Sequence, residues 1–188
     1  MLWAQNQSEI TFDVDSLNTE FLKINSITYK GNKITKAQII DRELTLHIGD
    51  SIPTKELKST LNYNVKRILN LQLFSLVNYQ ASLVNNNEID IEFRVIEILY
   101  WIGKPTFSLA DRNFNVWWVE ENHELSRTNI GANLVRHNFR GRNEEIATTL
   151  QLGYNKLFQF SYKIPFIDKN MHHGIGLSFA FATGREIN

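Results

Sequence analysis

Apolar and polar side chains alternate along several stretches in the second half of the chain. In residues 158–166 a large apolar side chain stands at every second position, and polar residues or proline stand between them. Successive side chains of a strand point to opposite faces, so this pattern predicts a strand with one apolar face. The other runs that predict strands are 106–118, 129–139, 145–154 and 174–183. Consecutive alternating runs of about ten residues are typical of an antiparallel barrel.

The first half of the chain contains two patterns with helical spacing. Thr35 is expected to begin the first helix, with Gln38 completing a capping box. Pro53 and Thr54 are expected to open the second helix. The apolar residues of that second helix recur every three or four positions: Leu57, Leu61, Val65 and Ile68.

Three strands are expected around these helices, at 22–29, 75–84 and 88–96. The first strand ends at Gly31 and Asn32, a turn signal. The order strand, helix, helix, strand, strand predicts a small α+β module of βααββ type, with both helices on one face of the sheet.

The apolar faces of the later strands contact either lipid or the core of a soluble protein. In residues 174–183 the second face consists of glycine, serine and alanine, which suits a barrel interior better than open solvent. Aromatic residues at expected strand ends fit the girdles of a membrane barrel, although they also fill soluble cores; they are Trp117, Trp118, Tyr154, Phe158 and Phe166. Under the lipid interpretation, the residues expected to face lipid include Phe160, Tyr162, Ile164, Leu177 and Phe179.

Composition excludes several classes of protein. The 188 residues have a formal net charge of zero, so no general attraction to nucleic acid is expected. Cysteine is absent, which excludes disulfides and thiolate metal sites. No run approaches the roughly 20 apolar residues of a membrane-spanning helix, whereas spanning by strands stays open. Residues 1–20 are interpreted as the remnant of a signal peptide followed by a solvated arm, or as an ordinary N-terminus.

No motif in the sequence indicates a catalytic site. The five histidines are dispersed without metal-binding spacing, and His172 and His173 stand in a polar turn where solvated side chains are expected. No glycine-rich phosphate loop occurs. No catalytic, metal-binding or cofactor-binding residue is therefore predicted, and the protein is not expected to be an enzyme.

Two groups of segments resemble a known family. The segments INSITYKGNKITKAQIIDREL, the following GD, and NVKRILNLQLFSLVNY are similar to a POTRA domain. The segments FSLADRNFNVWW, NLVRHNFRGRNEE and FSYKIPFIDK resemble the start of the barrel in outer-membrane assembly factors of the BamA type. The chain is accordingly divided into an arm at 1–20, a POTRA domain at 21–98 and the N-terminal part of a barrel at 99–188.

The resemblance implies a bacterial outer-membrane protein with its POTRA domain in the periplasm and a sixteen-stranded barrel that helps to fold and insert other barrels. Its implied partners are unfolded outer-membrane proteins, periplasmic or lipoprotein assembly factors, and the lipid bilayer. About five barrel strands are present, and the family's late Arg-Gly motif is not the Arg140-Gly141 pair of the early turn. The sequence is therefore interpreted as an N-terminal fragment. Two alternatives stay open: a two-partner-secretion transporter of polypeptides, and a soluble all-β binding module fused to a small α+β domain.

Two strand edges would carry the implied function. The POTRA strand at 75–84 is expected to lie at a sheet edge and to accept an extended partner, with Asn78, Gln80 and Ser82 exposed nearest to it. The strand at 106–118 alternates in two phases, so a bulge near 111–113 and weak pairing are expected there. In the family this first strand forms a seam that opens for client strands. The seam residues proposed on this basis are Phe107, Leu109, Asp111 and Asn113.

Overall fold

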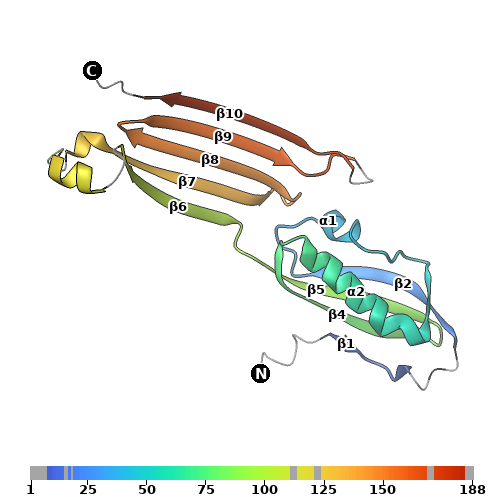
Figure 1. Ribbon diagram of the computed structural model, residues 1–188. Coiled ribbons are helices and arrows are strands. Elements are labelled where there is room, and N and C mark those ends of the chain that lie inside the picture. The colour runs from blue at the N-terminus through green and yellow to red at the C-terminus, as the bar shows by residue number, and fades with distance from the viewer. Residues whose placement is uncertain are drawn as a thin grey trace. The chain divides into compact units, whose positions relative to one another are not determined.

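The computed structural model describes residues 8–14, 17, 19–110, 114–120, 124–168 and 172–184. It divides into two compact units, Met1–Ile98 and Leu99–Asn188 (Figure 1). Each unit contains one five-stranded sheet. None of the helices in the described part of the chain is long and apolar enough to cross a membrane.

The first unit is the expected α+β module with two short strands added. Its sheet has the order β1-β4-β5-β2-β3, with β2 parallel to β5 and β4 antiparallel to β5. The strands are β1 (Glu9–Ile10), β2 (Phe21–Lys30), β3 (Ser51–Pro53), β4 (Phe74–Asn85) and β5 (Glu88–Glu97). The helical elements are α1 (Ala37–Asp41), the 3₁₀ turn η2 (Thr54–Glu56) and α2 (Leu57–Asn70), which lies across the sheet in Figure 1. The strands β1 and β3 have two and three residues, too few for a period-2 pattern to indicate them.

The core of the first unit lies between α2 and the sheet. The expected inward residues of β5, at positions 89, 91, 93 and 95, are all buried, as are Leu57, Leu61 and Ile68 of α2. Asn64 is also fully buried on this helix. Its side chain accepts a hydrogen bond from the Thr45 N–H at 2.8 Å and donates to the Thr60 carbonyl at 2.9 Å. The buried amide therefore joins the helix to the segment before β3 without leaving its polar groups unsatisfied.

The capping box expected at Thr35 is wrong. The helix α1 begins after Lys36, and no side chain caps it. The Thr35 hydroxyl instead donates to Glu97 Oε1 at 2.6 Å, and the Thr35 N–H donates to the same atom at 2.6 Å. The Ile34 N–H also donates to the Glu97 carboxylate at 3.1 Å. Glu97, at the end of β5 and 62 residues away in the sequence, thus accepts the hydrogen bonds of the Thr35 N–H and hydroxyl, which a local capping box would have used.

Replacing Glu97 tests this long-range contact. Glu97→Ala is expected to lower the free energy of unfolding by about 2–3 kcal/mol, because charge-assisted hydrogen bonds to buried groups are lost. Chemical unfolding of the chain measures the change. Glu88→Ala, at the partly exposed start of the same strand, removes a contact with the exposed Asn85 and is expected to cost less than about 0.5 kcal/mol. Equal losses for the two variants would contradict the role given to Glu97.

The second unit is an antiparallel meander. Its strands are β6 (Trp101–Leu109), β7 (Thr128–Phe139), β8 (Glu144–Gly153), β9 (Lys156–Ile164) and β10 (Ile175–Thr183). Their order in the sheet is β10-β9-β8-β7-β6, so that each strand pairs with its neighbour in sequence. The sheet is open, and β6 and β10 are its outer strands. The expectation of an α+β module followed by about five barrel strands is confirmed.

The first strand of this sheet was misplaced by the sequence pattern. It is β6, which pairs with β7 over residues Trp101–Leu109 without a register shift. Residues 114–120 are helical, and Trp117 is buried with its indole N–H donating to the Glu124 carbonyl at 2.9 Å. The two phases of alternation therefore come from two different elements, and Trp117 and Trp118 do not end a strand. The bulge expected at 111–113 lies outside the described residues.

Candidate functional site

Cross-strand registers give the second sheet one apolar face. Residues paired across adjacent strands share a face, and the row Phe181, Phe158, Leu150 is one example. Several of these side chains are well exposed: Leu177 is 65% exposed and Phe107 is 65% exposed. The large apolar residues that alternation and register place on this face are Trp101, Phe107, Leu109, Ile130, Leu134, Ile146, Leu150, Leu152, Phe158, Phe160, Tyr162, Ile164, Ile175, Leu177, Phe179 and Phe181. A contiguous surface of this kind, hereafter the apolar face, is unusual on a soluble monomer.

The opposite face carries mostly small and polar side chains, with Ile102, Val135 and Leu157 as apolar exceptions. On β10 it consists of Gly176, Ser178, Ala180 and Ala182. Neighbouring strands contribute polar groups that bond to one another. The Asn133 amide donates to the Thr149 hydroxyl at 2.9 Å, and Glu145 lies 3.0 Å from His137 Nδ1 and 3.7 Å from Lys163 Nζ. The sheet thus has one face suited to an apolar environment and one suited to water or a polar lumen.

The five residues expected to face lipid all belong to the apolar face: Phe160, Tyr162, Ile164, Leu177 and Phe179. Four of them have purely hydrocarbon side chains, whereas the hydroxyl of Tyr162 forms two hydrogen bonds. This hydroxyl accepts from Arg140 Nη2 at 2.6 Å and donates to Glu144 Oε2 at 2.9 Å. Tyr162 therefore lies at the border of the apolar face, beside the β7–β8 turn. What the five side chains contact stays a prediction.

That border combines aromatic rings with charged groups. Arg140 forms two hydrogen bonds of 2.9 Å with Glu144, whose side chain is only 1% exposed. The Arg136 guanidinium lies 4.9 Å from the centre of the Trp101 ring, on the strand pair next to the turn. Tyrosine and tryptophan beside arginine are typical of a membrane–water interface. The turn end of the apolar face thus has the composition of an interfacial belt.

The edge of β4 is covered in part, at Gln80 and Ala81, contrary to expectation. The strand β1 pairs with it in parallel, Glu9 opposite Gln80 and Ile10 opposite Ala81. The Thr11 N–H donates to the Ala81 carbonyl at 2.9 Å. The segment that covers the edge is part of the N-terminal arm, so residues 8–11 are paired with the sheet while Ser8, Glu9 and Thr11 stay exposed to solvent. A partner strand would meet this arm before it met β4.

The three edge residues differ in their surroundings. Asn78 is 9% exposed, so its expected exposure is wrong, and its Oδ1 accepts from the Ser8 hydroxyl at 3.5 Å. Gln80 and Ser82 are partly exposed. The Gln80 side-chain oxygen accepts a hydrogen bond from Arg94 of β5. Their role in binding a partner stays a prediction.

Arg94 belongs to a charged row on the same face of the first sheet. Glu92 lies between Lys30 Nζ and Arg94 Nε, at 2.6 Å from each. Burial tends to raise the pKa of Glu92, but the hydrogen bonds and charges of Lys30 and Arg94 outweigh it, so that the pKa lies below its ordinary value. Glu92 therefore stays ionised at neutral pH and holds Arg94 in place beside Gln80.

The residues proposed for a barrel seam are only partly described. Phe107 and Leu109 lie on β6, an outer strand, and share its apolar face. Asp111 and Asn113 lie outside the described residues. Pro105 on β6 has no N–H to donate, which an outer strand tolerates. The strand β6 pairs with β7 without a register shift, and weak pairing at its outer edge stays a prediction.

No metal centre is formed by the described part of the chain: it contains no group of three histidine, cysteine, aspartate or glutamate side chains that could hold an ion. The two neighbouring histidines of the β9–β10 loop are organised by Asp168. Its carboxylate accepts the His172 N–H at 3.1 Å and the His173 N–H at 2.8 Å. These backbone bonds lower the pKa of Asp168, and the arrangement is that of a capped turn.

Comparisons with known proteins found a matching family model for the first unit and similar structures for most of the chain. Residues 22–97 match the family model POTRA, described as surface antigen variable number repeat. The structure is similar to BamA from Haemophilus ducreyi lacking POTRA domains 1-3, with a TM-score of 0.62 and 16% identity over 86% of this chain and 27% of that chain. It also matches CdiB from Escherichia coli, with a TM-score of 0.48 and 8% identity over 86% of this chain and 28% of that chain. No curated protein sequence matches significantly.

The first unit is therefore a POTRA domain, as its βααββ order and the family model agree. The chain as a whole has the fold of a POTRA–barrel fragment of the BamA type, as the resemblance of its sequence implied. It spans little more than a quarter of the length of the BamA and CdiB chains that it matches.

Proposed function

We propose that this chain is part of an outer-membrane factor that assists the folding and insertion of other β-barrel proteins, with its POTRA domain in the periplasm. The two-faced sheet is the observation that carries the proposal. Sixteen large apolar side chains share one face across all five strands, and the other face is mostly small and polar. In lipid such a face costs nothing to expose, and the backbone groups of the inner strands β7, β8 and β9 are paired within the sheet.

The POTRA domain would act by binding an extended segment along β4. An exposed strand edge offers a row of backbone donors and acceptors, so it binds many sequences by the same main-chain contacts. This suits clients or assembly partners that share little sequence. The side chains nearest to such a segment would be Asn78, Gln80 and Ser82.

Reconstitution of the full-length protein tests this function. Liposomes that contain the protein are expected to fold a urea-unfolded outer-membrane barrel several-fold faster than empty liposomes, as measured by heat-modifiable gel mobility. Liposomes that contain an unrelated barrel protein serve as the control. Passage of a polypeptide into the lumen without faster folding would instead indicate a transporter. Solubility of the full-length protein without detergent would contradict the membrane location itself.

A further inference from the structure

The N-terminal arm holds the β4 edge by few contacts. Its strand β1 has two residues, whereas β4 has twelve. Beyond the two paired positions, the Thr11 hydroxyl approaches the Ala81 carbonyl at 3.0 Å and the Tyr79 N–H reaches the Ser8 hydroxyl at 3.4 Å. A contact of this size is short compared with ordinary strands of five or six residues. Another strand that pairs along more of β4 would gain more main-chain hydrogen bonds.

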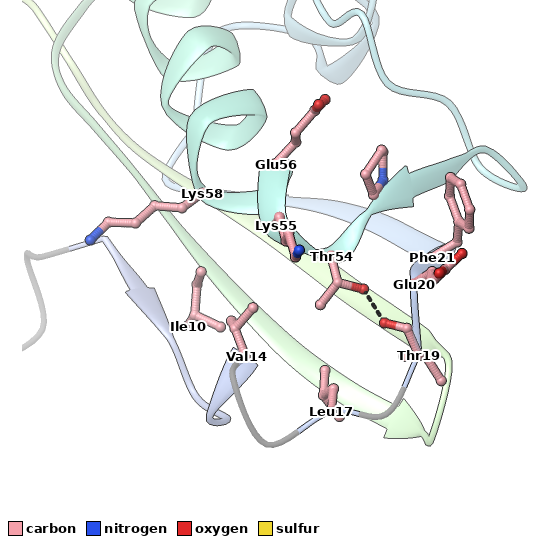
Figure 2. A pocket seen from close by; sticks show the side chains of 11 residues that line it. Ile10, Val14, Leu17, Thr19, Glu20, Phe21, Thr54, Lys55, Glu56 and Lys58 are labelled. Atoms are coloured by element: carbon pink, nitrogen blue, oxygen red, sulfur yellow. Dashed lines mark hydrogen bonds between the residues drawn. The ribbon is translucent and has the colours of Figure 1, made fainter.

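The inner side of the arm is incompletely packed. A cavity of about 860 Å³ lies between the arm and the start of the helical layer. Figure 2 shows Ile10, Val14 and Leu17 along one side of this cavity and Thr54 and Lys55 across from them. The cavity is partly open to solvent, so a segment with larger apolar side chains would bury more apolar surface there than the arm does.

The far end of the arm is held firmly. The Thr54 hydroxyl donates to the Thr19 carbonyl at 2.7 Å (Figure 2). The Thr54 N–H donates to the Glu20 carbonyl at 2.9 Å. These bonds tether the arm just before β2. Residues 8–14 can therefore leave the β4 edge while the chain stays attached beside it, which keeps the arm at high effective concentration for return.

We propose that the β4 edge is a strand-exchange site whose resident occupant is the arm at residues 8–14. The incoming partner is an extended polypeptide segment that runs parallel to β4 and places a large apolar side chain where Ile10 borders the cavity. The arm shields the edge until such a segment replaces it. This inference rests on the proposed function, and it adds the orientation of the partner, the side chain that the cavity selects and the competition with the chain's own arm.

A reversible lock on the arm tests the proposal in the full-length protein. These 188 residues contain no cysteine, and Glu9→Cys combined with Gln80→Cys introduces one designed disulfide between paired positions within them. The probe is a fluorescent peptide of residues 8–14, Ser-Glu-Ile-Thr-Phe-Asp-Val, and a second peptide carries Trp in place of the isoleucine. Fluorescence anisotropy measures the affinity of each peptide for the oxidised and the reduced protein. Each single-cysteine variant is the matched control.

Binding is expected to disappear on oxidation and to return on reduction. The tryptophan peptide is expected to bind more tightly than the native one because it fills the cavity. Thr11→Pro removes the N–H that bonds to Ala81 and is expected to raise the affinity of both peptides about tenfold, which corresponds to about 1.4 kcal/mol.

Three results would overturn the proposal. Equal binding to oxidised and reduced protein would place the peptide elsewhere. Absence of binding even to the Thr11→Pro variant would show that the edge takes no exchanged strand. A disulfide that links two protein copies on a non-reducing gel would show that the arm belongs to a neighbouring copy. The liposome folding assay on the reduced protein is independent of these results, so loss of strand exchange with normal client folding refutes this inference alone.

Discussion

Phe179→Arg is expected to prevent stable insertion of the full-length protein into lipid vesicles. Phe179 lies in β10 on the apolar face, opposite Phe160 of β9, and it is 57% exposed. If this face contacts lipid, a guanidinium at mid-strand costs about 2–4 kcal/mol near the bilayer midplane. Equilibrium unfolding in vesicles, followed by tryptophan fluorescence, measures the loss.

The neighbouring residue supplies the matched control. Ala180 is on the opposite face of the same strand, opposite Gln159, where the proposed environment is polar. Ala180→Arg is therefore expected to leave insertion nearly unchanged. Comparable damage by both substitutions would argue against a lipid contact specific to one face. The reverse order of effects would mean that the apolar face is turned inward.

Gly31→Ala is expected to give the largest loss of stability in the POTRA domain. Gly31 ends β2 with φ of +93°, a left-handed conformation that costs a residue with a Cβ about 1–2 kcal/mol. A Cβ at this position would also lie 2.0 Å from the Val95 carbonyl oxygen. Because that oxygen belongs to the backbone of β5, the strand itself must shift, and a total loss of about 3 kcal/mol or more is expected.

Gly49 separates the two causes. It has nearly the same backbone conformation, with φ of +94°, but a Cβ there would have no atom within 4 Å. Gly49→Ala is thus expected to cost only the conformational term of about 1–2 kcal/mol. Chemical unfolding of both variants provides the comparison. If the two variants lost the same free energy of unfolding, the close approach of Gly31 to β5 would not contribute to the loss in Gly31→Ala.

Most of the strands and both helices were predictable because each has a repeating local pattern. The four later strands β7 to β10 lie within two residues of their expected ends, since alternation over nine or more residues is a strong signal. The turn at Gly31 was predictable because the Gly31-Asn32 pair is itself a local turn signal. The strand β6 was misplaced because its own alternation is interrupted by Gly103 and Pro105, while the helical residues after it imitate a second phase. The glutamate that holds Thr35 left no local signal at all.

The two-faced character of the later strands was determined by the sequence itself, because a side chain's face in a strand depends only on whether its position is odd or even. Tertiary structure alone decided which faces combine, since a register shift of one residue between neighbours would have mixed apolar and polar rows. It likewise decided that the arm covers β4, because that pairing joins residues about 70 positions apart through main-chain groups that every sequence possesses. The side-chain pattern of a strand indicates which of its residues share a face. The segment that pairs with a sheet edge is held by main-chain contacts, so it depends on which distant part of the chain folds back beside that edge.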